Sequence, residues 1–229
     1  MDETTAKALG WRRADADLGI LPGLRHVGGE VTADTLLAGF RVGAFPLPTS
    51  TPDLLGWYSP DPRAVLVHDQ LRCEADTLRR ARRWRITIDE CFDSVVQACA
   101  DREERWIDDT FRAVYRELRE RGHAHSVEVW EGAELVGGLF GVSIGGFWSG
   151  ESMFHRRRNA SKAAVYALVG ILQHAGCRWH DVQYLTPFTA GFGATGIPRA
   201  AYLERLQAAT QGPQMELVLP VALSGDGAE

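Results

Sequence analysis

The chain has 229 residues, of which 45% are hydrophobic and 24% charged, close to the average of globular proteins. This composition excludes a disordered chain and a fibrous repeat, and the length suits one ordinary domain with a smaller one beside it. With 25 Lys and Arg against 30 Asp and Glu, the formal net charge of -5 excludes nucleic-acid binding over the whole surface, though not through a local basic patch.

The first part of the chain, residues 1–58, is predicted to form a small N-terminal domain ahead of a second domain over residues 59–229. Residues 33–42 carry apolar side chains at helical spacing and end at Gly43, which predicts a short helix. The segment FPLPTSTPDLLGWYSPDPR that follows holds five prolines. Proline excludes regular helix over most of this segment, so a loop is predicted.

The second domain shows strand and helix signals in a mixed order. They are predicted as strands 64–68 and 85–89, helices 92–99 and 109–121, strands 125–130, 134–144 and 145–154, helix 159–175, strand 179–185, a helix opened by Pro198, and strand 215–220. This order predicts a mixed α/β fold, of the α+β kind with a mixed sheet. It resembles the acyltransferase fold of the GCN5-related N-acetyltransferases. In that fold two splayed central strands expose backbone groups to an acyl donor, so an amine-acylating enzyme is the leading class.

Coenzyme A is a poor candidate for that donor. The coenzyme A enzymes of this fold hold the pyrophosphate on a glycine-rich loop, Q/R-x-x-G-x-G/A, after the strand that corresponds to residues 145–154. Here the following residues, HRRRNASKAA, contain no glycine. A coenzyme A-dependent small-molecule N-acyltransferase therefore remains an alternative that this segment opposes.

A cluster of arginines predicts contact with a polyanion. Its members, within seven positions that include no acid, are Arg79, Arg80, Arg82, Arg83 and Arg85, with Arg72 upstream. A charge run is usually a solvated helix face, but these side chains would repel one another unless phosphates neutralised them. Because arginine also offers bidentate phosphate contacts, RNA is the predicted partner.

Two further signals concern the compartment. The longest apolar run, residues 163–172, is about half of the roughly 20 residues that a membrane helix needs. The acidic and polar N-terminus carries no apolar stretch of a secretory signal. A cytoplasmic protein without a membrane span is therefore expected.

Several long and unusual motifs identify a family. They are GAFP (43–46), WYSPDPRAVL (57–66), CADREERWI (99–107), GHAHSVEVW (122–130), ELVGGLFGV (134–142), GESMF (150–154), NASKAA (159–164), D-x-Q (181–183) and GAxxIPR (193–199). In these motifs the chain resembles the leucyl/phenylalanyl-tRNA-protein transferases, over about residues 18–205.

The resemblance implies transfer of Leu, Phe or Met from aminoacyl-tRNA to the N-terminal Arg or Lys of acceptor proteins, which marks them for N-degron proteolysis. Because the aminoacyl ester is already activated, the reaction needs no metal, ATP or other cofactor. A monomer is expected, since no long apolar seam is visible. A non-catalytic RNA-binding protein on the same scaffold remains a second alternative.

The resemblance also implies the catalytic residues. Asp181 and Gln183 stand two residues apart on one strand, so both side chains are predicted to point to the same face, toward the mouth of the cleft. Gln183 is assigned to positioning the attacking α-amine, because a neutral amide is a poor base. Asp181 orients the reacting groups or supports the developing ammonium, and Glu151 is a nearby polar anchor.

The remaining assignments concern the aminoacyl pocket and the tRNA. The pocket residues implied by the resemblance are Phe40, Leu47, Trp106, Tyr115, Leu139 and Trp148, and the tRNA-binding residues are Arg72, Arg79, Arg80, Arg82 and Arg83. Leu47 stands where the family commonly has Trp, and Phe40, Leu139 and Trp148 also depart from the usual residues. Exchanging large apolar groups shifts discrimination by roughly 1–3 kcal/mol, so the order of preference among donors is left open.

Overall fold

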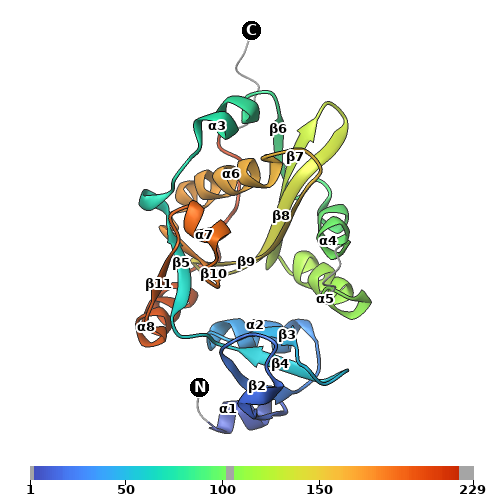
Figure 1. Cartoon of the computed structure of the whole chain (residues 1–229), viewed down its shortest axis with the longest axis vertical. Coiled ribbons are helices and arrows are strands. Elements are labelled where there is room, and N and C mark those ends of the chain that lie inside the picture. Colours follow the sequence, from blue (N-terminus) through green and yellow to red (C-terminus); the bar gives the residue numbers. More distant parts are fainter. Residues whose placement is uncertain (1–2, 102–105, 222–229) are drawn as a thin grey trace.

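The computed structural model describes residues 3–101 and 106–221. Its N-terminal part is a four-stranded antiparallel sheet of order β1-β2-β4-β3 with two helices, at the lower end of the molecule in Figure 1. The elements are α1 (Glu3–Ala8), β1 (Trp11–Arg13), η1 (Ala16–Leu18), β2 (Leu24–Gly28), α2 (Ala33–Arg41), β3 (Phe45–Pro48) and β4 (Leu55–Tyr58).

The proline-rich segment contains two strands where a loop was predicted. β3 pairs with β4 through Phe45 opposite Tyr58 and Pro46 opposite Trp57. β3 is an edge strand, so one of its sides has no neighbouring strand and forms no ladder hydrogen bonds. Proline, which lacks an N–H group, is tolerated in such a strand. The prolines exclude helix, as predicted, but they do not exclude an edge strand.

The larger sheet has seven strands in the order β11-β5-β10-β9-β8-β7-β6. All neighbours are antiparallel except β9 and β10, which run parallel. Its elements are β5 (Arg63–Val67), η2 (His68–Gln70), α3 (Ala75–Ala81), β6 (Arg85–Ile88), α4 (Phe92–Ala100), α5 (Asp109–Glu120), β7 (Ala124–Glu131), β8 (Glu134–Ile144), β9 (Phe147–His155), α6 (Ala160–His174), β10 (Trp179–Gln183), α7 (Pro187–Gly191), β11 (Thr195–Ile197) and α8 (Arg199–Thr210).

Helices cover both faces of this sheet (Figure 1). On one face α4 and α5 pack against β7, β8 and β9, and a buried core joins them to α2, α8 and the N-terminal sheet. On the other face α6 packs across β7, β8 and β9 and forms a second core together with residues of β5 and the segment around α7. Each central strand therefore contributes side chains to two different cores.

The mixed α/β class is confirmed, and most predicted elements are present. Among the described residues 213–220 there is no strand, so the predicted strand 215–220 was wrong. The first turn of α5 is capped by Asp108, whose Oδ1 accepts from the Phe111 N–H at 2.9 Å. Pro198 is the N-cap of α8 rather than its first residue, and β10 ends at Gln183, two residues earlier than predicted.

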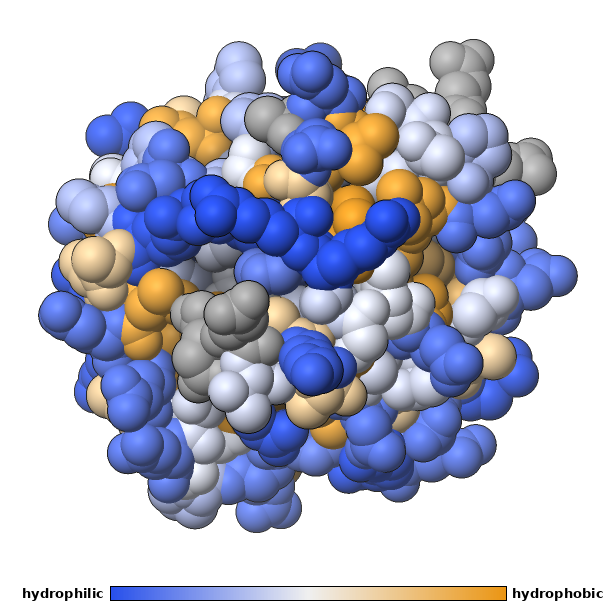
Figure 2. All heavy atoms as spheres, turned by 90° about the horizontal axis from the view of Figure 1, so that it is seen from below, coloured by the Kyte–Doolittle hydropathy of each residue, from blue (hydrophilic) through white to orange (hydrophobic). Residues whose placement is uncertain are grey.

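The division at residue 58 falls between the two sheets, in the connection from β4 to β5. The buried core is nevertheless continuous across it, since Trp57 and Tyr58 belong to the same cluster as Val65 and Tyr115. The division into two domains at residue 58 stays a prediction. The outer face at the N-terminal end is mostly hydrophilic, with hydrophobic side chains in scattered groups (Figure 2).

Candidate active site

The central strands β9 and β10 diverge in the middle of the large sheet. They pair at a single position, Asp181 opposite Ser149. Each strand also carries a bulge there, because Val182 has no partner on β5 and Glu151 has none on β8. Bulges next to functional sites re-aim side chains. The divergence is the splayed pair expected of the acyltransferase-like fold.

A cavity of about 840 Å³ opens at this divergence. Strand β9 lines it from Gly150 to His155, followed by Arg156, and β10 lines it with His180, Val182 and Gln183. On one side it reaches Trp106 and Phe140, and on the other it reaches the helix α6 and the segment around α7. The cavity therefore connects the two faces of the sheet through the gap between β9 and β10, a volume suited to a sizeable ligand.

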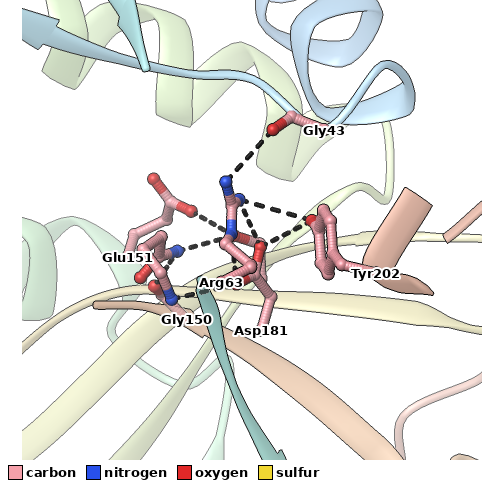
Figure 3. Close-up of polar contacts among 8 residues, drawn as sticks. Gly43, Arg63, Gly150, Glu151, Asp181 and Tyr202 are labelled. Carbon is pink, nitrogen blue, oxygen red and sulfur yellow. Dashed lines mark hydrogen bonds and ion pairs between the residues drawn. The ribbon is translucent and has the colours of Figure 1, made fainter. Parts of the chain in front are cut away.

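A buried ion pair lies directly behind the divergence (Figure 3). Arg63 donates to Asp181 twice, from Nε to Oδ1 at 2.9 Å and from Nη2 to Oδ2 at 2.6 Å, and both side chains are almost fully buried. The Tyr202 hydroxyl donates to Asp181 Oδ2 at 2.8 Å, and Arg63 Nη1 donates to the Gly43 carbonyl at 3.1 Å. The network thus ties β5 and β10 to α8 and to the N-terminal part.

Asp181 does not face the cleft, so the prediction that it shares a face with Gln183 was wrong. The bulge at Val182 breaks the two-residue alternation, and Gln183 adopts a left-handed backbone with φ of 59°. Asp181 Oδ1 instead accepts the backbone N–H of Gln183 at 2.9 Å. Asp181 therefore fixes the backbone from which Gln183 enters the cavity.

The Gln183 side chain has a defined orientation. Its Nε2 donates to the Gly150 carbonyl at 2.7 Å and to Ser149 Oγ at 2.9 Å. A carbonyl can only accept, so the nitrogen must face Gly150 and the amide oxygen Oε1 points away from it. Gln183 lines the cavity, and Oε1 has no hydrogen-bond partner within the described structure. The site thus presents a neutral acceptor to whatever binds there.

Glu151 lies beside Gln183 and is held by two hydroxyl groups. Ser149 Oγ donates to Oε1 at 2.9 Å and the Tyr115 hydroxyl donates to Oε2 at 2.7 Å. Burial raises the pKa of Glu151 to about 7, and the nearby Asp181 acts in the same direction, although both hydroxyl bonds oppose the shift. Close to pH 7 the group is therefore divided between its carboxyl and carboxylate forms.

Exchange of Glu151 for glutamine is expected to change how stability depends on pH. A carboxyl group whose pKa is raised by folding binds more protons in the native state than in the unfolded chain. The wild-type free energy of unfolding should therefore fall, relative to E151Q, as pH rises from about 5 to 8, by at most about 3 kcal/mol. Urea unfolding across this range tests it, with exposed Glu204→Gln as the control. Parallel curves for wild type and E151Q would contradict the assignment.

Comparison with known proteins gives the family. Residues 65–207 match the family model described as leucyl/phenylalanyl-tRNA protein transferase. The chain belongs to this family. Relatives that carry the name leucyl/phenylalanyl-tRNA–protein transferase include those of Shewanella baltica (strain OS185), 41% identical over 83% of this chain and 83% of the relative, and of Ectopseudomonas mendocina (strain ymp), 43% identical over 81% and 84%.

Salinibacter ruber (strain DSM 13855 / M31) has a relative of the same name that is 42% identical over 77% of this chain and 79% of its own length. Among solved structures, a conserved protein of unknown function from Bacteroides thetaiotaomicron VPI-5482 matches 68% of this chain and 58% of its own, with 12% identity and a TM-score of 0.37. This structural likeness is too low to support an inference.

Only some of the six residues assigned to the aminoacyl pocket line the cavity. Trp106 and Leu139 line the cavity, from opposite faces of the sheet. Tyr115 is buried and holds Glu151 through its hydroxyl. The other three lie elsewhere: Phe40 is buried on α2, Leu47 is on the edge strand β3, and Trp148 is enclosed in the core beneath α6.

Phe40, Leu47 and Trp148 therefore do not line this cavity, and their assignment to the aminoacyl pocket stays a prediction. Trp148 is adjacent to Ser149 on β9, so strand alternation sends its side chain to the face opposite the Ser149 hydroxyl. Phe40 faces the N-terminal core because it follows Leu36 by four positions on the buried side of α2. The motif CADREERWI is described only in part, since residues 102–105 lie outside the described residues.

The arginine cluster is less repulsive than the sequence suggested. Asp76, one turn earlier on α3, pairs with Arg79 at 2.5 Å and with Arg80 at 3.0 Å, and Glu90 pairs with Arg85 at 2.9 Å. The expectation that the arginines repel one another unless phosphates neutralise them was therefore wrong for Arg79, Arg80 and Arg85, because acids just outside the seven-position window pair with them. Within the described part of the chain, the exposed residues Arg72, Arg82 and Arg83 form no ion pair.

The residues that sequence reasoning missed are Arg63, Ser149 and Tyr202. Arg63 was quoted within the motif WYSPDPRAVL, but nothing in the local pattern distinguishes a buried arginine from an exposed one. Ser149 directly precedes GESMF and Tyr202 follows GAxxIPR by three positions. Proximity to family motifs was the only available signal for these two.

Proposed function

We propose that this protein transfers leucine, phenylalanine or methionine from aminoacyl-tRNA to the N-terminal Arg or Lys of acceptor proteins, marking them for N-degron proteolysis. The family is named for aminoacyl transfer from tRNA to protein, and the chain is an aminoacyltransferase of that family. The observation that carries the proposal is the cavity at the β9–β10 divergence, where apolar walls adjoin the polar pair Glu151 and Gln183.

The proposed chemistry is aminolysis of the aminoacyl ester. The α-nitrogen of the acceptor attacks the ester carbonyl carbon, a C–N bond forms, and the bond from that carbon to the ribose oxygen breaks. The leaving ribose oxygen takes up one proton, and the nitrogen loses one, so no external oxidant or nucleotide is consumed. The main demand on the protein is to hold amine and ester in attack geometry, which can supply a large part of the rate enhancement.

Gln183 is proposed to position the attacking amine. Its free Oε1 accepts a hydrogen bond from the amine N–H and thereby aims the nitrogen lone pair toward the carbonyl. Asp181 acts through Gln183 and does not touch substrate, because its oxygens are occupied by Arg63, Tyr202 and the Gln183 N–H. Of the two roles predicted for Asp181, this geometry supports orientation rather than contact with the ammonium.

Glu151 is proposed as the polar anchor for the cationic acceptor. Its carboxylate lies at the cavity wall next to Gln183, and two hydroxyl donors fix its direction. A positive charge on the acceptor terminus would favour the ionised form of Glu151. Recognition of N-terminal Arg and Lys rather than neutral residues follows from this pairing.

The arginine cluster is proposed as a contact for the tRNA. Arg72 lies next to the cavity, since its backbone N–H donates to the carbonyl of the cavity residue Phe192 at 2.9 Å. Arg82 and Arg83 follow directly after α3 and are exposed. Arg79 and Arg80 belong to the same surface but share the acid Asp76. A tRNA bound along this surface would place its 3′ end at the cavity.

Charge reversal at Arg82 and Arg83 is expected to weaken tRNA binding and to lower the slope of log affinity against log salt by about 2. These two arginines are chosen because Asp76 already compensates Arg79 and Arg80. The matched control, R41E/R205E, makes the same change of charge on α2 and α8. Filter binding of tRNA at several salt concentrations measures both. An unchanged slope in R82E/R83E would remove the surface from the tRNA site.

The experiment that tests the function is transfer of labelled Leu, Phe and Met from charged tRNA to a peptide with N-terminal Arg or Lys, without ATP or coenzyme A. Peptides that start with Ala, or with an acetylated α-amine, are the controls. Label in the Arg and Lys peptides alone is the expected result. Binding of tRNA without transfer would indicate the non-catalytic alternative, and turnover of acetyl-coenzyme A would indicate the small-molecule acyltransferase.

The state and location of the protein are further parts of the proposal. We propose a cytoplasmic monomer with an N-terminal domain over residues 1–58 and a catalytic domain over 59–229. Within the described ranges, no helix is long and apolar enough to cross a membrane. On the face in Figure 2 the hydrophobic side chains lie in separate groups, so this face does not offer the continuous apolar patch that a stable dimer interface usually needs.

A further inference from the structure

One part of the cavity is almost entirely apolar. It lies on the face of the sheet that α6 and α7 cover, and we call it the inner lobe. Its walls are Leu66, Leu139, Ser161, Val165, Leu168, Phe192 and Ala194. His180 lies on the floor of the inner lobe and is 3% exposed. An imidazole in such surroundings needs a hydrogen-bond partner for each ring nitrogen, or it costs free energy.

The His180 ring belongs to a buried chain of hydrogen bonds. His180 Nδ1 lies 3.0 Å from Nε2 of His68, and His68 Nδ1 lies 3.2 Å from the carbonyl oxygen of Cys177. Both rings are buried, and burial lowers the pKa of His68 to about 4 and that of His180 to about 3. Both imidazoles are therefore neutral near pH 7.

These hydrogen bonds fix the tautomer of each histidine ring. The Cys177 carbonyl can only accept, so His68 carries its proton on Nδ1 and has a lone pair on Nε2. His180 Nδ1 must then donate to that lone pair, which places the single proton of His180 on Nδ1. The remaining nitrogen, Nε2 of His180, is an unprotonated acceptor.

This acceptor is open to the cavity. Nε2 of His180 has no partner among the described residues. It is also not one of the fully enclosed unpartnered nitrogens of the described structure, which are Trp11 Nε1, His26 Nδ1 and Trp148 Nε1. The inner lobe therefore offers a single ring acceptor within apolar walls, and a ligand with a donor at the right depth would satisfy it.

We propose that His180 determines donor specificity by accepting a hydrogen bond from the phenolic O–H of a tyrosyl group, so that tyrosyl-tRNA is a donor substrate. The proposal rests on the proposed function. His180 and Gln183 pair with Leu66 and Ala64, which are two positions apart on β5, so the span between them along the sheet is about 7 Å. The hydroxyl of Ser or Thr lies too near its own carbonyl to cover this span, whereas the aromatic ring of tyrosine fills the apolar walls and carries its hydroxyl at the far end.

The binding test uses non-hydrolysable donor analogues, adenosine with tyrosine or phenylalanine joined to a 3′-amino group. Wild-type protein is expected to bind the tyrosyl analogue about tenfold more tightly than the phenylalanyl analogue, because only tyrosine satisfies the buried acceptor. Transfer from tyrosyl-tRNA and phenylalanyl-tRNA to an Arg peptide should show the same order in kcat/KM. Equal binding of the two analogues, or tighter binding of the phenylalanyl analogue, overturns the proposal.

The variant test removes His180, alone or together with His68. His180→Leu leaves His68 Nε2 without its donor, and H68L/H180L leaves the Cys177 carbonyl without its donor, so the two variants differ in which group is left unpaired and are measured side by side. Both should lose the tyrosyl preference, so that the ratio of the affinities for the tyrosyl and phenylalanyl analogues falls at least about tenfold. Exposed His174→Leu, at the end of α6, is the control and should keep the wild-type ratio.

The outcomes separate the two proposals. A tyrosyl preference that survives in H68L/H180L overturns the role of His180, even if transfer is normal. Transfer of Leu and Phe but not Tyr in the wild type also overturns it, while the proposed function stands. If no donor is transferred but the tyrosyl analogue is bound preferentially and only through His180, the inner lobe is as proposed and the transferase function is wrong.

Discussion

Replacement of Arg63 by methionine is expected to lower the free energy of unfolding by about 3–5 kcal/mol, the largest stability effect of any single side chain in the site. The change leaves the Asp181 carboxylate buried without its counter-ion, and Asp181 is 0% exposed. The remaining donors, the Tyr202 hydroxyl and the Gln183 N–H, cannot neutralise the charge. Desolvation of an unpaired carboxylate is the cost.

Packing around the guanidinium also contributes to the effect. The Arg63 side chain lies between the rings of Phe45 and Tyr202, with its central carbon 4.6 Å and 4.5 Å from the two ring centroids. Methionine keeps the apolar part of these contacts but loses the cation–π attraction. It also leaves the Gly43 carbonyl without the Nη1 donor. Loss of the ion pair therefore loosens the junction between the two sheets.

Urea unfolding measures the effect, and a double variant isolates its cause. R63M/D181N removes the charge that R63M strands, so it should be more stable than R63M by at least about 1 kcal/mol. The surface pair Arg116–Asp93, with side chains 56% and 59% exposed, provides the control, and R116M should cost less than about 1 kcal/mol. A loss of unfolding free energy in R63M no larger than in R116M would contradict the role of the buried ion pair.

The same pair shows which parts of the site a sequence can predict. Asp181, Gln183 and Glu151 were assigned from family motifs, and the structure brings Gln183 and Glu151 to one cavity wall. Arg63 lies 118 positions from Asp181, and no local pattern couples two residues so far apart in the chain. Charged side chains are rarely buried, so an arginine at the start of a strand is read as exposed by default.

Bulges explain why Asp181 and Gln183 do not share a face of β10. A strand that reads D-x-Q predicts two side chains on one face only if the alternation is unbroken. The unpaired Val182 breaks it on β10, and the unpaired Glu151 breaks it on β9. One extra residue shifts the phase of the alternation, but a central strand that is covered on both faces shows no clear polar–apolar alternation in which the shift could be seen. The helices α2, α4, α5 and α6 were predicted to within one residue at each end, because their apolar spacing repeats over two turns or more. The shorter helices α1, α3 and α7 were not predicted.

The hydrophobic pattern also could not separate a cavity wall from a core. Trp106 and Leu139 line open space, whereas Trp148 is enclosed, yet all three are large apolar residues in family motifs. Burial favours such side chains equally in both places. What distinguishes them is the divergence of β9 from β10, a tertiary property of the sheet. Proteins of this fold therefore need coordinates before a pocket residue can be told from a packing residue.

Exchange of Gln183 for alanine is expected to lower kcat/KM for aminoacyl transfer by about 100-fold or more, with tRNA affinity within a factor of two. The amide contributes the free Oε1 that we assign to the acceptor amine, and Nε2 holds that oxygen in direction through Gly150 and Ser149. Neither Oε1 nor Nε2 contacts the arginine cluster that we assign to the tRNA. The loss should therefore appear in transfer and not in binding.

The left-handed backbone at this position supplies a control. Gln183 has φ of 59°, which costs an L-residue roughly 1–2 kcal/mol and costs glycine almost nothing. Alanine bears the same backbone cost as glutamine, so Q183A deletes the amide without relieving strain. Q183G deletes the amide and relieves the strain. The two variants should be equally impaired in transfer, while Q183G unfolds at a higher urea concentration than Q183A.

This pairing separates a role in chemistry from a role in folding. If Gln183 acted only by stabilising the bulge of β10, transfer would recover in Q183G together with stability. If the amide itself positions the amine, transfer stays low in both variants whatever their stability. Steady-state transfer to an Arg peptide and urea midpoints, measured on the same preparations, give the two readouts. Near-wild-type kcat/KM in Q183A and Q183G alike would exclude Gln183 from the site and leave Glu151 as its polar centre.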